Sequence, residues 1–68
     1  MQNYNIFRVF NSSVEQAHSF RPGLNGKHAI EVATGEAMQY DHTLHLDNGD
    51  FEVFTDAHNR YFLAQVIR

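Results

Sequence analysis

The sequence predicts a single small α+β domain, rich in β-structure, with one short N-terminal helix packed on an antiparallel meander of about four or five strands. A length of 68 residues allows only one domain, which spans residues 1–68. Apolar residues make up 43% of the chain and charged residues 19%, which is typical of a folded rather than a disordered protein. From Lys27 onward, short β-branched and aromatic segments alternate with turns rich in Gly, Asn and Asp.

The first third of the chain predicts a strand followed by a short helix. Residues 4–10 are mostly β-branched and aromatic and show no helical period, so a strand is expected there. Ser12 precedes Glu15 by three residues, which is the spacing of a capping box at a helix start. We therefore expect a helix over 12–20, which ends before Pro22.

The remaining chain predicts a meander. A strand is expected over 28–33, and residues 37–40 either form another strand or lead into a strand over 42–46. The strongest local signal is Asn48-Gly49, because these two residues tolerate the positive φ angles of a type I′ hairpin turn. A second, looser turn is expected over 56–59.

The hairpin turn also predicts which side chains share a face. Pairing Asp47 with Asp50 sets Leu44 opposite Val53, which places the apolar side chains of this hairpin together in the core. The expected core comprises Ile6 or Phe7, Val9, Val14, Ala17, Ile30, Val32, Leu44, Leu46, Phe51, Val53, Phe62, Ala64 and Val66. If Thr55 pairs with Arg60, the opposite face carries Phe54, Tyr61, Leu63 and Ile67.

One short helix covers one face of a sheet, which leaves two alternatives for this second apolar face. Either the sheet curls into a small closed barrel, as in SH3-like domains, or the second face contacts another chain.

Charge is distributed unevenly along the sequence. The formal net charge is −3, but no Lys or Arg lies between Lys27 and Arg60, so that block carries −7 and the remaining residues +4. General attraction to nucleic acid or to an anionic membrane is therefore not expected. Two interpretations stay open: the acids keep strand surfaces and edges from aggregating, or they face a basic partner.

The residue types that commonly act in catalysis or bind metals are not arranged in a pattern that predicts a catalytic, metal or cofactor site. The chain contains no cysteine, which excludes disulfides, thiolate zinc sites and a cysteine nucleophile. His42 and His45 lie three residues apart, and such positions point to opposite faces of a strand. A surface pair between His45 and Glu52 is expected instead. The alternative is a metal- or pH-responsive binding protein that uses His28, His42, His45 and His58.

These observations together predict a non-enzymatic interaction module, an inhibitor or adaptor that binds a larger protein with a basic surface. The expected partner-binding residues are Phe54, Tyr61, Leu63 and Ile67, with His45, Asp47, Asp50 and Glu52 around them. A homodimer is the alternative association, and neither direct nucleic-acid binding nor a membrane is expected. No signal peptide is visible, so a cytoplasmic protein is expected. In general character the chain resembles small acidic inhibitors and adaptors of phages and mobile elements.

Overall fold

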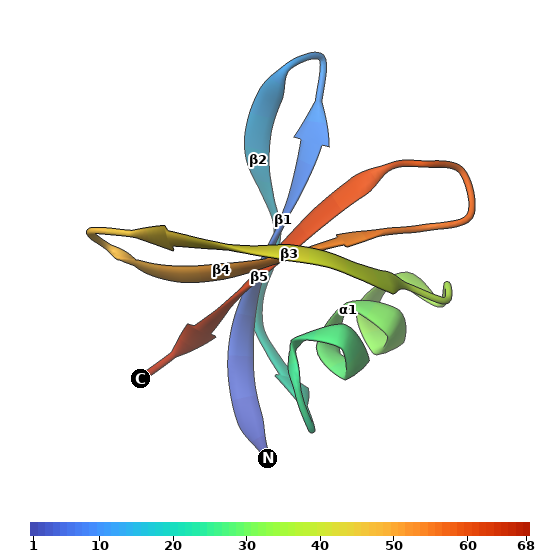
Figure 1. Cartoon of the computed structure of the whole chain (residues 1–68). Coiled ribbons are helices and arrows are strands. Elements are labelled where there is room, and N and C mark those ends of the chain that lie inside the picture. The colour runs from blue at the N-terminus through green and yellow to red at the C-terminus, as the bar shows by residue number, and fades with distance from the viewer.

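A computed structural model, which describes residues 1–68, contains one open five-stranded sheet and one α-helix (Figure 1). The strand order is β2-β1-β5-β4-β3, and each neighbouring pair is antiparallel. Because β2 and β3 are both edge strands, the sheet does not close into the alternative SH3-like barrel. The elements are β1 (Gln2–Phe10), β2 (Ser13–Gly23), α1 (Gly26–Thr34), β3 (Gln39–Leu46), β4 (Gly49–Thr55) and β5 (Tyr61–Ile67).

The strand predicted over 4–10 is confirmed as β1, but the helix predicted over 12–20 is wrong, because this segment forms β2. Asn11 and Ser12 have φ angles of 49° and 64°, so both occupy the left-handed region that a type I′ turn requires. Phe10 pairs with Ser13 across this two-residue loop. Ser12 therefore serves the turn of a β1–β2 hairpin rather than the start of a helix.

The helix lies instead at 26–34, where the sequence predicted a strand over 28–33. Asn25 caps its N-terminus, because its side-chain oxygen accepts a hydrogen bond of 2.8 Å from the backbone N–H of His28. Gly35 ends the helix with a φ of 75°, and its N–H donates to the carbonyl oxygen of Glu31. Ala29 and Ile30 point into the core.

The β3–β4 hairpin is confirmed, but its register differs from the predicted one by two residues. Leu46 pairs with Gly49 and Leu44 with Phe51, so the loop consists of residues 47–48. Gly49 has a φ of 124°, whereas neither loop residue has a positive φ, so the turn is not type I′. Because side chains alternate with a period of two along a strand, an offset of two residues leaves each side chain on its predicted face, and Leu44 and Phe51 still share a face.

The β4–β5 connection is one residue longer than predicted. Thr55 pairs with Tyr61 rather than with Arg60. Relative to β4, each side chain of β5 therefore lies on the face opposite to the predicted one. Phe54 consequently lies opposite Phe62, on the side of the sheet that α1 covers.

The sheet is strongly twisted, so its strands cross one another in the view of Figure 1. Apolar side chains gather on both of its faces. The main core lies under α1 and consists of Tyr4, Ile6, Ala29, Ile30, Met38, Phe54, Phe62 and Ala64. A smaller cluster on the opposite face contains Phe51, Val53 and Leu63, with Phe7 packed against it. The Phe7 and Phe51 rings meet edge to face with centroids 5.6 Å apart.

The predicted core is confirmed only in part, since α1 covers one face of the sheet and several predicted core residues lie on edge strands or on the outer side of α1. Buried as predicted are Ile6, Ile30, Phe51, Val53, Phe62 and Ala64, while Phe7 and Val66 are half-buried. The structure exposes Val9, Val14, Ala17, Val32, Leu44 and Leu46, for which the prediction was wrong.

Candidate binding surface

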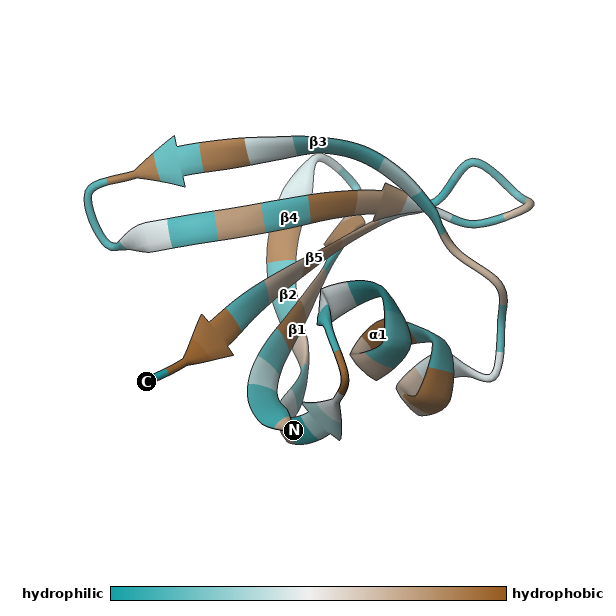
Figure 2. Ribbon diagram, turned by 60° about the horizontal axis from the view of Figure 1, so that its bottom comes forward, coloured by the Kyte–Doolittle hydropathy of each residue, from teal (hydrophilic) through white to brown (hydrophobic).

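The β3–β4 hairpin extends away from α1, and hydrophilic and hydrophobic residues alternate along it (Figure 2). Alternation gives the hairpin two chemically different faces. One face carries Leu44, Leu46, Phe51 and Val53, and the other carries Thr43, His45, Asp50 and Glu52. Leu44 and Leu46 remain 37% and 53% exposed, which leaves apolar surface on the outer strand of the hairpin.

The polar face contains a histidine–carboxylate pair that differs from the predicted one. His45 lies opposite Asp50, and its Nδ1 is 2.9 Å from the Asp50 Oδ1. Glu52, the partner predicted for His45, lies opposite Thr43 instead. Both side chains of the observed pair are more than half exposed, so this contact contributes little to folding.

Glu52 is half-buried and directed toward the N-terminus of α1. A Cβ atom placed on Gly26, the first helical residue, would lie 2.5 Å from the Glu52 Oε1. A carboxylate at this end of a helix is favoured by the helix dipole. Glu52 takes part in none of the four ion pairs of the chain. Burial, followed by the negative charge of Glu52, raises the pKa of the neighbouring Tyr4 hydroxyl.

The polar face of the hairpin borders a hollow of about 250 Å³ that α1 leaves uncovered. Its lining includes the acids Asp50 and Glu52 and one base, Arg68. Buried Tyr4 also lines it, and its hydroxyl donates a hydrogen bond of 3.0 Å to the Gln2 Oε1. Acidic character therefore dominates the charged groups on this side of the hairpin.

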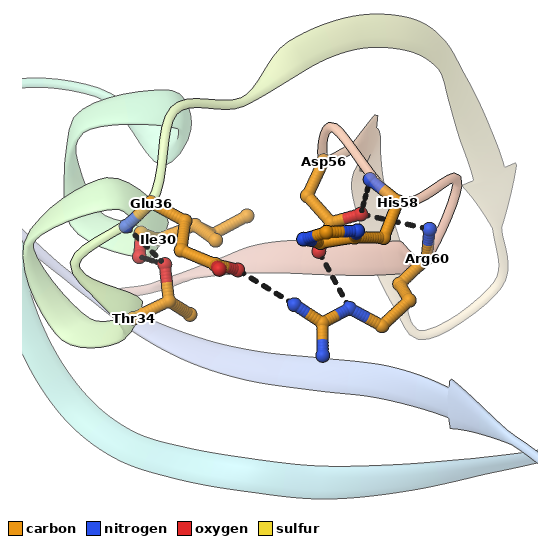
Figure 3. Close-up of polar contacts among 6 residues, drawn as sticks. All are labelled: Ile30, Thr34, Glu36, Asp56, His58 and Arg60. Carbon is orange, nitrogen blue, oxygen red and sulfur yellow. Dashed lines mark hydrogen bonds and ion pairs between the residues drawn. The ribbon is translucent and has the colours of Figure 1, made fainter.

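Asp56 and Arg60 form a structural network that sequence reasoning missed (Figure 3). The Asp56 side chain accepts hydrogen bonds from the backbone N–H groups of His58 and Arg60 and from the Arg60 Nε. The Arg60 Nη2 also donates to the Glu36 Oε2 at 2.7 Å, which ties this loop to the segment after α1. Burial alone would raise the pKa of the Asp56 carboxyl, but these hydrogen bonds and the charge of Arg60 lower it to about 2.

The seven acids between Lys27 and Arg60, a segment without Lys or Arg, therefore have different roles. Glu36 and Asp56 bind Arg60, and the Glu31 carboxylate accepts a hydrogen bond from the Met38 backbone N–H. The other four, Asp41, Asp47, Asp50 and Glu52, all lie on the β3–β4 hairpin. Asp41 pairs with His42 and Asp50 with His45, and no Lys or Arg forms an ion pair with a carboxylate of the hairpin.

The predicted partner-binding residues do not form the expected single surface. Phe54 is a core residue with 2% exposure, so its placement on an open face was wrong. Tyr61 and Leu63 lie on the face opposite α1, where Tyr61 is 43% exposed and Leu63 is buried. Ile67 is half-buried at the end of β5. His45, Asp47, Asp50 and Glu52 do gather on the hairpin, with Asp47 in its loop.

The histidines are dispersed over the molecule. No group of three or more His, Asp or Glu side chains converges as metal ligands would. His28 accepts a hydrogen bond at Nδ1 from the Leu24 backbone N–H, which is a local contact at the start of α1.

Comparisons with protein-family models, with curated proteins and with solved structures find no match for this chain. No helix in the structure is both long and apolar enough to cross a membrane.

Proposed function

We propose that this protein is a non-enzymatic interaction module, an inhibitor or adaptor that binds a larger protein with a basic surface through the β3–β4 hairpin. One observation carries the proposal: Asp41, Asp47 and Asp50 are exposed, Glu52 lines the hollow, and no Lys or Arg forms an ion pair with any of these four carboxylates. The proposed compartment is the cytoplasm.

The hairpin combines two properties that suit protein recognition. Its carboxylates attract and orient a basic partner, because complementary charge raises the association rate and excludes partners of like charge. Its exposed Leu44 and Leu46 supply apolar surface that a partner can bury. Affinity then comes from the leucines, and selectivity comes from the acids.

Capture of partners from an extract of the native host tests the proposal. Tagged wild-type protein is compared with the double variant Asp47→Asn/Asp50→Asn, and bound proteins are quantified by mass spectrometry. Glu15→Gln on β2 serves as the control, because Glu15 is an exposed acid away from the hairpin. We expect one stoichiometric partner that the double variant loses at least tenfold and the control retains, with binding that weakens as salt rises. Equal capture by the double variant would contradict the proposal.

A further inference from the structure

The two free edges of the sheet differ in their capacity to pair with another strand. Along β2, the pairing with β1 shifts register twice, between Tyr4 and Ile6 and between Ile6 and Phe7. Phe20 has a φ of 53°, outside the strand region, and Pro22 has no N–H to donate. Bulges and proline are features that prevent edge strands from pairing, so β2 is a blocked edge.

In contrast, β3 has a single register shift, between Tyr40 and His42, and is regular from His42 to Leu46. Leu46 and Gly49 close a two-residue loop, so these two residues exchange both ladder hydrogen bonds. Hydrogen-bonded and non-bonded pairs alternate along an antiparallel ladder, so the backbone N–H and C=O groups of Thr43 and His45 point away from β4. These four groups form an open edge.

The side chains around this edge indicate what an added strand would carry. On one face it would run beside the exposed Leu44 and Leu46. On the other face it would run beside Thr43 and His45, with carboxylates close by on β4 and at both ends of β3. An added strand whose side chains alternate between apolar and basic would match both faces.

We infer that β3 receives an extended segment of the partner protein, with alternating apolar and basic side chains, as a sixth strand of the sheet. This inference rests on the proposed function and assigns its binding mode. A second copy of the chain fits less well. The register that pairs Thr43 of each copy with His45 of the other brings Asp41, at the register shift of β3, near Asp47 in the loop of the other copy, so like charges meet at both ends of the paired segment.

Amide hydrogen exchange measured by NMR with synthetic peptides tests the inference. The probe is a seven-residue peptide in which lysine and valine alternate, and two controls carry glutamate in place of lysine or the same composition in blocks. We expect the alternating lysine peptide to slow exchange of the Thr43 and His45 amides at least tenfold. The amides of His42 and Leu44, which already bond to β4, should change little.

Thr43→Pro provides the matched variant. It removes an outward N–H without removing a bond to β4, and proline is tolerated on an edge strand at such a position. Thr43→Val, which keeps the N–H, is the control. We expect Thr43→Pro to abolish the response to the peptide and Thr43→Val to retain it, and circular dichroism verifies that both variants are folded. His45→Pro is the second proline variant. If neither Thr43→Pro nor His45→Pro folds, protection of the Thr43 and His45 amides in the wild-type protein decides whether the peptide adds to β3.

Three results would overturn the inference: no protection at Thr43 and His45, equal protection by the glutamate peptide, or a β3-mediated dimer in sedimentation that Thr43→Pro dissociates. If the peptide fails while Asp47→Asn/Asp50→Asn still loses its captured partner, the proposed function stands and only its strand-addition mode is wrong. If the hairpin variants capture every partner as wild type does, the proposed function itself is wrong.

Discussion

Truncation of two aromatic residues, Phe54 and Tyr61, tests the observed register between β4 and β5. Phe54 is 2% exposed and packs edge to face against Tyr40, with ring centroids 5.8 Å apart. Phe54→Ala should therefore cost about 3–5 kcal/mol of folding free energy. At about 0.05–0.15 kcal/mol per residue, a 68-residue domain has only about 3–10 kcal/mol in total. Tyr61→Ala removes a side chain that is 43% exposed and should cost less than about 1.5 kcal/mol.

Urea unfolding followed by far-UV circular dichroism measures both variants, and the difference between their free energies of unfolding is the decisive quantity. If Phe54→Ala does not fold, Phe54→Leu keeps most of the volume and should cost about 1–2 kcal/mol, a loss that can be measured. Equal losses for the Phe54 and Tyr61 variants, or a larger loss for Tyr61→Ala, would refute the burial of Phe54 under α1.

Three further changes have defined outcomes. Gly23→Ala should destabilise the fold by at least about 2 kcal/mol in urea unfolding, because the new Cβ would lie 2.7 Å from the backbone nitrogen of Ala29; a wild-type midpoint would contradict this contact. Ser12→Gly should raise stability by about 0.5–1 kcal/mol, since glycine adopts the φ of 64° without strain; a lower melting temperature would show that the β1–β2 turn has another geometry. The pKa of Asp56 is lowered from its usual 3.8 to about 2, so its contribution to stability is fully present above about pH 4 and is lost as the pH falls toward 2. Melting temperatures measured across this range should depend less on pH in Asp56→Asn than in wild type, and identical pH dependence would argue against the network.

Local patterns predicted the strands that have clear alternation and a definite turn. The first strand and the β3–β4 hairpin are confirmed, since β-branched and aromatic residues flank recognisable turn residues there. The predicted hairpin register was wrong by two residues. Asn48 and Gly49 have the residue types of a type I′ turn, but the loop consists of residues 47–48, and Gly49 is the first residue of β4. An even offset does not change which side chains share a face, so Leu44 still lies beside Phe51.

Helix and strand were interchanged between residues 12 and 34 because each segment satisfies a rule of the other class. Ser12 and Glu15 have capping-box spacing, but strong pairing of β2 with β1 decides the conformation there. Ala29 and Ile30 suit a strand by composition, but the Asn25 cap and the left-handed Gly35 enclose a nine-residue helix. Asn25 and Gly35 are recognisable helix caps, and together with the helical spacing of Gly26, Ala29 and Ile30 they would have predicted α1.

The error with the largest effect on the candidate site is the predicted length of the β4–β5 loop, which was one residue too short. Asp56 accepts two backbone N–H bonds within that loop, which lengthens it, and Arg60 is held by Glu36, 24 residues earlier in the sequence. A contact over that separation leaves no local pattern, whereas the aspartate at the start of the turn is a recognisable signal for side-chain bonding to the loop backbone. The extra residue turns β5 over, so the aromatic surface predicted around Phe54 does not exist. The outer edge of the acidic hairpin keeps its exposed leucines, carboxylates and outward backbone groups, and in the proposed binding mode these groups, rather than aromatic rings, contact the partner.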